Sequence, residues 1–365
     1  MSTTQTDLET EIGTYAEQLF ATGMAGFEAV TIGLGRRLGL YAALAGGVAK
    51  TPGQVADDAG VHPRYAREWL EQQAAAGLVS VDDDGGPETR RYSLSPAAEE
   101  CLLNPDSLAS VGPMLDAVVA IGSIFPRIVD AYRSGRGVPF SDYQIHDIQA
   151  NFNRPGFVNL LTSEWLPAVP GLGDRLGASP PAQVAEIGCG EGWAAISIAR
   201  AWPMVQVDAY DLDEASIAAA RINARGAGVD DRVRFEVVDA TRDLQPTGNH
   251  DLVFAFETIH DLARPREALT AMRGLGAPDA IYLVIDERVG DAFEAPAENP
   301  IERFLYAASV LHCLPVGMAE SPSAATGTIM RPATLRQYAA DAGFAGVKIL
   351  PIENDFFRFY QLVDA

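Results

Sequence analysis

Cysteine, lysine and long apolar runs are all scarce in this chain of 365 residues. Its three cysteines, Cys101, Cys189 and Cys313, are far apart and odd in number, so they predict neither a disulfide framework nor a metal cluster. No apolar stretch approaches the length of a membrane span, and residues 1–11 are polar and acidic rather than a signal peptide. We therefore expect a cytoplasmic protein with no membrane partner.

Positive charge is also in short supply. The 27 Lys and Arg residues face 49 Asp and Glu residues, which gives a formal net charge of -22. Such a surface repels phosphate backbones, so nucleic acid is not an expected partner. Apolar residues make up 48% of the chain, which is ample for the cores of two domains.

The N-terminal part of the chain has the pattern of a winged helix. Residues 8–44 carry apolar side chains at helical spacing, and Thr51-Pro52 is a favourable start for the next helix, which ends at Gly60. A further helix is predicted over 64–76, followed by strands at 78–81 and 91–94 around an acidic loop. Two helices joined by a turn and followed by a two-stranded wing predict a winged-helix domain over residues 1–110.

Further helices are predicted over residues 111–178, as a linker and substrate lid, and strands then alternate with helices over 179–365. This alternation predicts an α/β domain with a doubly wound parallel sheet. A short polar turn separates the last two strands, so we expect a hairpin and one antiparallel edge strand. The predicted strands are 184–187, 205–210, 233–238, 250–256, 280–285, 347–352 and 357–363.

The first of these strands leads into a turn with glycines at alternate positions, Gly188, Gly190 and Gly192. Glycines allow a tight turn and let a ligand approach the main chain, while the helix that follows offers free N–H groups. Glu186, just before the turn, would repel a phosphate but suits a cationic ammonium or sulfonium group. An NAD-binding fingerprint is disfavoured, because Trp193 stands where that motif needs its third glycine.

Polar and aromatic residues stand at the carboxyl ends of the next three strands, where open α/β sheets bind ligands. An acidic residue about twenty positions after a glycine turn accepts hydrogen bonds from ribose hydroxyls, and Asp211 is in that place. Together with the glycine turn, these strand ends predict a nucleoside cofactor site. The residues are Asp211 with Leu212, Asp239 with Ala240, and Phe256 with Glu257.

The E-x-G-x-G-x-G turn and these strand ends resemble the class I S-adenosylmethionine-dependent methyltransferases. The resemblance implies a seven-stranded Rossmann-like sheet and S-adenosyl-L-methionine as cofactor, with Asp239 at the adenine amino group and Phe256 and Glu257 near the methionine portion. More loosely, the whole chain resembles actinobacterial small-molecule methyltransferases of secondary metabolism, in which the winged helix builds a homodimer and does not read DNA. The matching segments are residues 34–41, 64–70, 164–167 and His260-Asp261.

The segment after the fourth strand places His260 where substrate and cofactor are expected to meet. An imidazole accepts a proton near neutral pH, and Asp261 could orient it, so we predict these two residues as catalytic. Four further residues are predicted to line the substrate side: Trp165, Tyr306, His312 and Met318.

Two alternatives stay open at this point. By resemblance to iron-dependent 2-oxo acid C-methyltransferases, His260 and His312 could hold Fe(II), although two histidines far apart are a weak metal signal, and the main prediction is no metal. The other alternative is a winged-helix transcriptional regulator with a nucleotide-sensing domain, suggested by Arg64 and Arg67. The acidic wing, residues 82–84, argues against it because carboxylates repel DNA phosphates.

Overall fold

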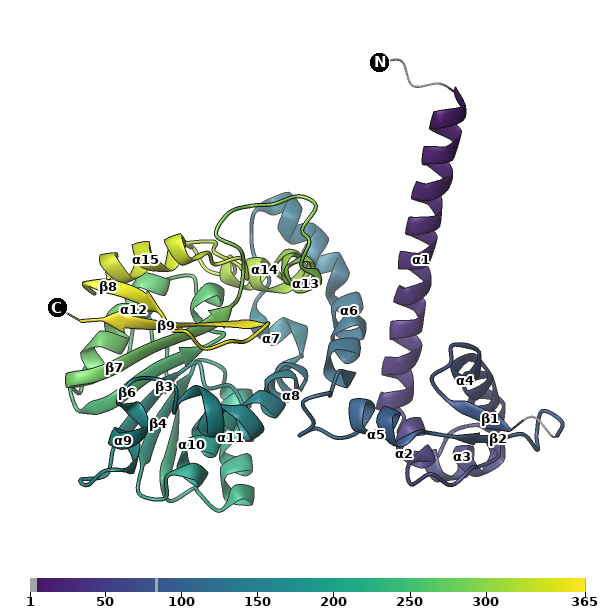
Figure 1. Ribbon diagram of the computed structural model, residues 1–365, viewed down its shortest axis with the longest axis horizontal. Coiled ribbons are helices and arrows are strands. Elements are labelled where there is room, and N and C mark those ends of the chain that lie inside the picture. Colours follow the sequence, from purple (N-terminus) through teal and green to yellow (C-terminus); the bar gives the residue numbers. More distant parts are fainter. Residues whose placement is uncertain (1–4, 83–84, 365) are drawn as a thin grey trace. The chain divides into compact units, whose positions relative to one another are not determined.

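The computed structural model describes residues 5–82 and 85–364, and the chain forms two compact units, residues 1–122 and 123–365 (Figure 1). The boundary lies inside helix α6 (Gly112–Ser134), so most of the predicted linker over 111–178 belongs to the second unit. Asp83 and Asp84 of the acidic wing lie outside the described residues.

The first unit has the predicted winged-helix order. The helix expected over 8–44 is two helices, because Gly39 adopts a left-handed conformation, with φ 72°, that ends the regular helix. Thr51 accepts a hydrogen bond from the Gln54 N–H and forms a capping box, as its place before a proline suggested. The elements are α1 (Gln5–Arg37), α2 (Leu40–Leu44), α3 (Pro52–Ala59), α4 (Pro63–Ala75), β1 (Ser80–Asp82), β2 (Arg91–Ser93) and α5 (Pro96–Leu102).

The second unit is built on a seven-stranded sheet with strand order β5-β4-β3-β6-β7-β9-β8. Strands β3 to β7 are parallel, which confirms the doubly wound α/β class. The predicted hairpin is present, but its antiparallel strand β9 lies between β7 and β8 rather than at the edge. Phe359 and Tyr360 of β9 are buried, whereas Lys348 of the short edge strand β8 is exposed. The strands are β3 (Gln183–Ile187), β4 (Gln206–Asp211), β5 (Val233–Val237), β6 (His250–Phe256), β7 (Gly276–Glu287), β8 (Gly346–Ile349) and β9 (Phe357–Val363).

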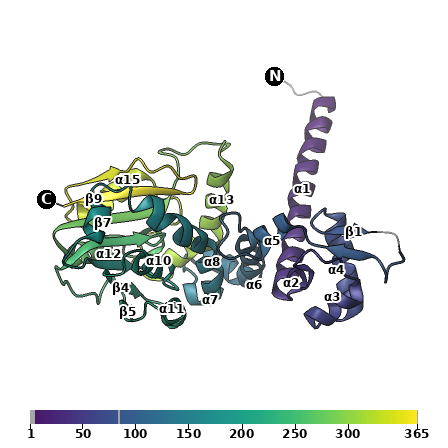
Figure 2. The same cartoon turned by 60° about the horizontal axis from the view of Figure 1, so that its bottom comes forward.

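Helices cover both faces of this sheet (Figures 1 and 2). Successive strand residues point to opposite faces, so Val184 packs in the core under α10 and α11, and Ala185 packs in the core under α12 and α15. Because both faces are buried, strands such as β6 are almost continuously apolar. The helices are α10 (Trp193–Ala201), α11 (Glu214–Ala227), α12 (Pro265–Leu275) and α15 (Pro332–Asp341).

The remaining helices of this unit come from the segments before β3 and after β7, except for one short helix that follows β6. Two of them are π-helical, a form that is often found near functional sites. Among the described residues, no helix is both long enough and apolar enough to cross a lipid bilayer. The helices are α7 (Phe140–Tyr143), α8 (His146–Gly156), the π-helix η1 (Phe157–Trp165), α9 (Leu172–Gly177), the 3₁₀-helix η2 (Ile259–Asp261), α13 (Pro300–Ala308), the π-helix η3 (Ser309–Cys313) and α14 (Leu314–Gly317).

Candidate active site

A cavity of about 500 Å³ opens at the carboxyl ends of β3, β4, β5 and β6. The structure brings nine of the ten predicted cofactor residues to its wall, and the tenth, Gly192, packs behind the turn. The nine lining residues are Glu186, Gly188, Gly190, Asp211, Leu212, Asp239, Ala240, Phe256 and Glu257. Their convergence follows from the topology, because the carboxyl ends of parallel strands meet at one edge of the sheet.

The three glycines of the turn have different roles, although all have positive φ angles. A Cβ at Gly188 would collide with the Thr258 side chain, and one at Gly192 would lie 2.6 Å from the Phe235 ring. A Cβ at Gly190 would meet none of the described atoms within 4 Å, and Gly190 lines the cavity. Gly188 and Gly192 therefore allow close packing of the chain, and Gly190 keeps the space in front of the turn open.

Asp211 holds the glycine turn as well as lining the cavity. One carboxylate oxygen accepts a hydrogen bond from the Gly190 N–H at 2.8 Å, and the other accepts one from the Asp213 N–H at 2.9 Å. Burial raises the pKa of Asp211, and these two hydrogen bonds oppose that shift by favouring the carboxylate. On the next strand end, Asp239 accepts hydrogen bonds from both the N–H and the hydroxyl of Thr241.

Glu186, which we predicted to suit a cationic ligand, is 2% exposed and lies at the cavity wall. Its carboxylate accepts a hydrogen bond from the Ala195 N–H, in the first turn of α10, at 3.1 Å. Burial raises the pKa of Glu186 well above its ordinary value. A positive charge bound in the cavity would favour the ionised form of this carboxylate.

His260 does not line the cavity and is surrounded by carboxylates. Its Nδ1 lies 2.8 Å from Asp286 Oδ1 and 3.1 Å from Glu287 Oε2, and its Nε2 lies 3.2 Å from Asp261 Oδ1. Burial lowers the pKa of His260, but the three carboxylates outweigh burial and raise that pKa well above 6.5. The predicted pairing with Asp261 is present, but an imidazole held in its protonated form cannot take up a proton. This geometry does not favour the general-base role that we predicted for His260.

Glu257 is the cavity residue whose chemistry the sequence did not reveal. Its φ angle is +46°, an uncommon conformation for a residue other than glycine, and strain of this kind clusters at functional sites. The Asn153 side-chain amide donates a hydrogen bond to its carboxylate. Burial raises the pKa of Glu257 to about 7. The only sequence signal was an acidic residue directly after a buried strand, which we interpreted as a contact to the cofactor.

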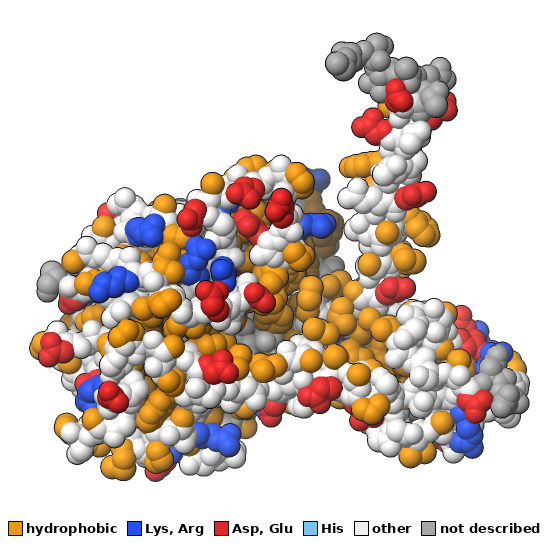
Figure 3. Space-filling view, in the orientation of Figure 1, with side chains coloured by type: hydrophobic (Ala, Val, Ile, Leu, Met, Phe, Trp, Pro, Cys, Tyr) orange, Lys and Arg blue, Asp and Glu red, His pale blue; other side chains and the backbone are white. Residues whose placement is uncertain are grey.

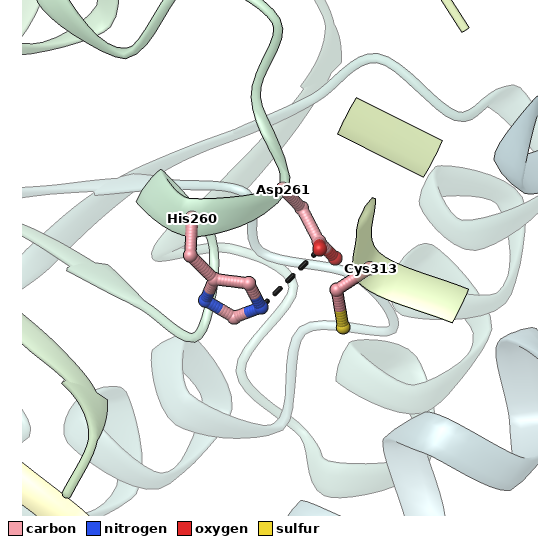
Figure 4. Close-up of side chains that lie close together, drawn as sticks. All are labelled: His260, Asp261 and Cys313. Atoms are coloured by element: carbon pink, nitrogen blue, oxygen red, sulfur yellow. Dashed lines mark ion pairs between the residues drawn. The ribbon is translucent and has the colours of Figure 1, made fainter. Parts of the chain in front are cut away.

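Two groups of side chains near the cavity have the composition of a metal site. Figure 4 shows the first, in which potential ligand atoms of His260, Asp261 and Cys313 lie within 4.8 Å of one another; His260, Asp286 and Glu287 form the second. His312 belongs to neither group, and its ring packs against Tyr143. Neither group contains both His260 and His312, the pair that the Fe(II) alternative requires.

None of the four residues predicted for the substrate side lines the cavity. Trp165 packs in the core against Phe256 and Phe359, since aromatic residues at helical spacing face the interior. The hydroxyl of Tyr306 accepts a hydrogen bond from Arg331. His312 and Met318 also lie outside the wall, although Val316 and Ala319 are part of it. The wall opposite the strand ends comes instead from helix α8 and its neighbours: Phe140, His146, Gln149, Ala150, Asn153 and Phe157.

Comparison with known families agrees with both units. Residues 179–316, which include β3 to β7 and most of the cavity wall, match the family model described as a methyltransferase domain. The chain contains a methyltransferase domain. Residues 26–103 match the model of an Rv2258c-like winged helix-turn-helix domain. The methyltransferase domain and the N-terminal winged helix that we predicted from the sequence are thereby confirmed.

Individual relatives extend the likeness beyond the methyltransferase domain. A 27-O-demethylrifamycin SV methyltransferase from Amycolatopsis mediterranei is 37% identical over 25% of this chain, but the match spans only 35% of that relative's own length. The tetracenomycin polyketide synthesis 8-O-methyl transferase of Streptomyces glaucescens is 26% identical over 83% of this chain and 84% of its own. Human N-acetylserotonin methyltransferase, solved in complex with S-adenosylmethionine, is similar over the full length of both chains, with a TM-score of 0.69 at 16% identity, which shows a shared fold.

Proposed function

We propose that this protein transfers a methyl group from S-adenosyl-L-methionine to a small-molecule acceptor of secondary metabolism. The observation that carries this proposal is the open space in front of Gly190, bordered by Asp211, Asp239 and Glu257 within a methyltransferase domain. A ligand with ribose hydroxyls, an amino group and a cationic sulfonium matches this glycine-lined and acidic wall. The acceptors named for the rifamycin and tetracenomycin relatives support a small organic acceptor.

When bound, the cofactor supplies an electrophilic methyl group on a cationic sulfur. The residues of the chain would place the acceptor in line with that group and keep water out, and Phe157 and Phe256 give the cavity an apolar section for this purpose. We propose Glu257 as the group that takes the proton from the acceptor. Its carboxylate lies at the wall, and a pKa of about 7 suits a general base at neutral pH.

Binding and turnover test this function separately. Calorimetry with S-adenosylhomocysteine should show saturable binding, whereas NAD should give no heat. A methyl-transfer assay with radiolabelled cofactor and a panel of phenolic polyketides should then label at least one acceptor. If folded protein does not bind S-adenosylhomocysteine, the proposed function is wrong.

We also propose that the protein forms a homodimer through α1. This helix of 33 residues exposes large apolar side chains at spacings of three and four, and Phe20 is 74% exposed and Phe27 79%. Figure 3 shows apolar side chains along the helix. Such a stripe on a long helix suits an identical helix of a second copy. The exposed apolar residues are Leu8, Ile12, Tyr15, Leu19, Phe20, Met24, Phe27, Val30 and Leu34.

Charged substitutions in this stripe test the dimer. Replacing Leu19 and Phe27 by Glu should convert the protein to monomers, because each copy would bury two carboxylates in the contact. Sedimentation velocity measures this directly. The control replaces Thr14 and Gln18 by Glu, which adds the same charge on the opposite face of the helix and should leave the dimer intact. A wild-type protein that sediments as a monomer would disprove the proposal.

We propose, finally, that the winged helix does not bind nucleic acid and that the protein works in the cytoplasm. The arginines that suggested DNA binding have carboxylate partners: Arg64 pairs with Glu68, and Arg67 pairs with Glu88. These pairs offset the positive charge that a DNA-binding helix needs. Cys101, Cys189 and Cys313 are free thiols, which suits a reducing compartment.

A further inference from the structure

Helix α8 presents one polar face to the cavity. His146, Gln149 and Asn153 lie at positions i, i+3 and i+7 of the helix, and all three line the cavity wall. Residues with this spacing share one side of a helix. The chain therefore places a strip of three polar side chains, hereafter the α8 strip, opposite the strand ends that carry the predicted cofactor residues.

Each side chain of the α8 strip has a buried polar atom with no hydrogen-bond partner among the described residues. These atoms are His146 Nε2, Gln149 Oε1 and Asn153 Oδ1. His146 Nε2 lies 3.3 Å from Asp213 Oδ2, without the geometry of a hydrogen bond. Buried polar atoms in native proteins almost always have a partner, so three of them on one face of one cavity indicate that a ligand or ordered water supplies the missing bonds.

Contacts along α8 hold this face in place over the loops that follow three strands. At its start, His146 lies beside Asp213, just after β4. At its end, the Asn153 amide donates to Glu257, after β6, and the Arg154 guanidinium lies 4.0 Å from the Trp193 ring, after β3. The α8 strip thus runs from the strand end that carries Asp211 to the strand end that carries Glu257.

The chemistry of the strip matches a ligand that is rich in hydrogen-bond donors. Gln149 Oε1 and Asn153 Oδ1 are acceptors, and the facing wall adds the carboxylates of Asp211, Asp239 and Glu257. A nucleoside with ribose hydroxyls and a cationic amino-acid portion offers hydroxyl and ammonium donors along one extended molecule. A phosphate-bearing ligand offers mainly acceptors and would leave these oxygens without partners.

We propose that the α8 strip forms the second wall of the cofactor site and hydrogen-bonds S-adenosylmethionine directly, with His146 and Gln149 toward the nucleoside end and Asn153 toward the end beside Glu257. This inference rests on the proposed function. It assigns binding residues to a segment outside the E-x-G-x-G-x-G turn and the strand ends from which we predicted the site.

Calorimetric titration with S-adenosylhomocysteine and with S-adenosylmethionine tests the strip without knowledge of the acceptor. Gln149→Ala and Asn153→Ala should each weaken binding about 3- to 10-fold, the range for one lost hydrogen bond in a buried site. Asn151→Ala is the matched control, since Asn151 is on the same helix but does not line the cavity, and its affinity should stay within about 2-fold of wild type. Circular dichroism confirms that each variant is folded.

The outcomes separate this inference from the proposed function. If the wild type binds and Gln149→Ala and Asn153→Ala bind as tightly as Asn151→Ala, the strip contacts only ordered water and the inference is overturned, while the proposed function stands. If both variants lose affinity and the control does not, the inference is supported. If the folded wild type binds neither ligand, the proposed function and this inference fail together.

Discussion

Valine in place of Gly190 should weaken cofactor binding while leaving the fold intact. Gly190 has a φ angle of +51°, and a left-handed backbone costs a residue with a Cβ about 1–2 kcal/mol. Nothing among the described residues lies within 4 Å of the new Cβ, so the fold loses stability only through this strain. Within the cavity, however, the isopropyl group occupies ligand space. Overpacking costs about 1–3 kcal/mol, which corresponds to an affinity loss of about 5- to 150-fold.

Gly228→Val is the matched control for the backbone strain. Gly228 ends α11 with a φ angle of +69°, has nothing within 4 Å of its Cβ position among the described residues, and does not line the cavity. Both variants should lose similar stability in urea denaturation, but only Gly190→Val should lose affinity for S-adenosylhomocysteine in calorimetry. Equal affinity of the two variants would refute the assignment of this space to the ligand.

Gly192→Ala separates packing from binding in the same turn. Its Cβ would lie 2.6 Å from the Phe235 ring and 3.1 Å from Ala220 Cβ, so overpacking adds about 1–3 kcal/mol to the backbone strain. Because Gly192 does not line the cavity, the folded fraction of this variant should bind S-adenosylhomocysteine with near wild-type affinity.

Two further predictions concern the carboxylates and the imidazole beside the cavity. Because the pKa of Glu257 is raised to about 7, this group is protonated below that pH and acts as a base above it. The methyl-transfer rate should therefore rise with pH to a plateau above about 7. Glu257→Gln should lower kcat about 10²- to 10⁴-fold and abolish this rise of the rate with pH. An unchanged pH profile would contradict the role of Glu257 as general base. His260→Ala should cost about 3–5 kcal/mol of unfolding free energy, because Asp286 and Glu287 would lose their buried counter-charge. The pKa of His260 is raised, so its stabilising effect is present below pH 6.5 and is lost as the pH rises through the folded-state pKa. Urea denaturation from pH 6 upward should show the gap between wild type and His260→Ala narrowing at alkaline pH, and a constant gap would be inconsistent with this account.

Much of the fold and half of the site could be predicted from local patterns. The glycine turn, the cap at Thr51, and the alternation of buried strands with helices depend on residues close together in the chain. The strand-end residues that line the cavity followed from these patterns, because the carboxyl ends of parallel strands lie at one edge of the sheet. The position of β9 between β7 and β8 was not predicted, since the pairing of strands depends on contacts between distant segments.

The environment of each titratable group was decided by the tertiary structure alone. His260 and Asp261 are neighbours in sequence and looked like a base with its orienting carboxylate. Asp286 and Glu287 reach the same imidazole from β7, and this second pair favours the protonated ring. Likewise, α8 faces the cavity because His146 contacts Asp213 and Asn153 contacts Glu257. These partners lie 67 and 104 positions further along the chain. Local residue order therefore determined what kind of ligand the strand ends can hold, and long-range packing determined which side chains can exchange protons with it.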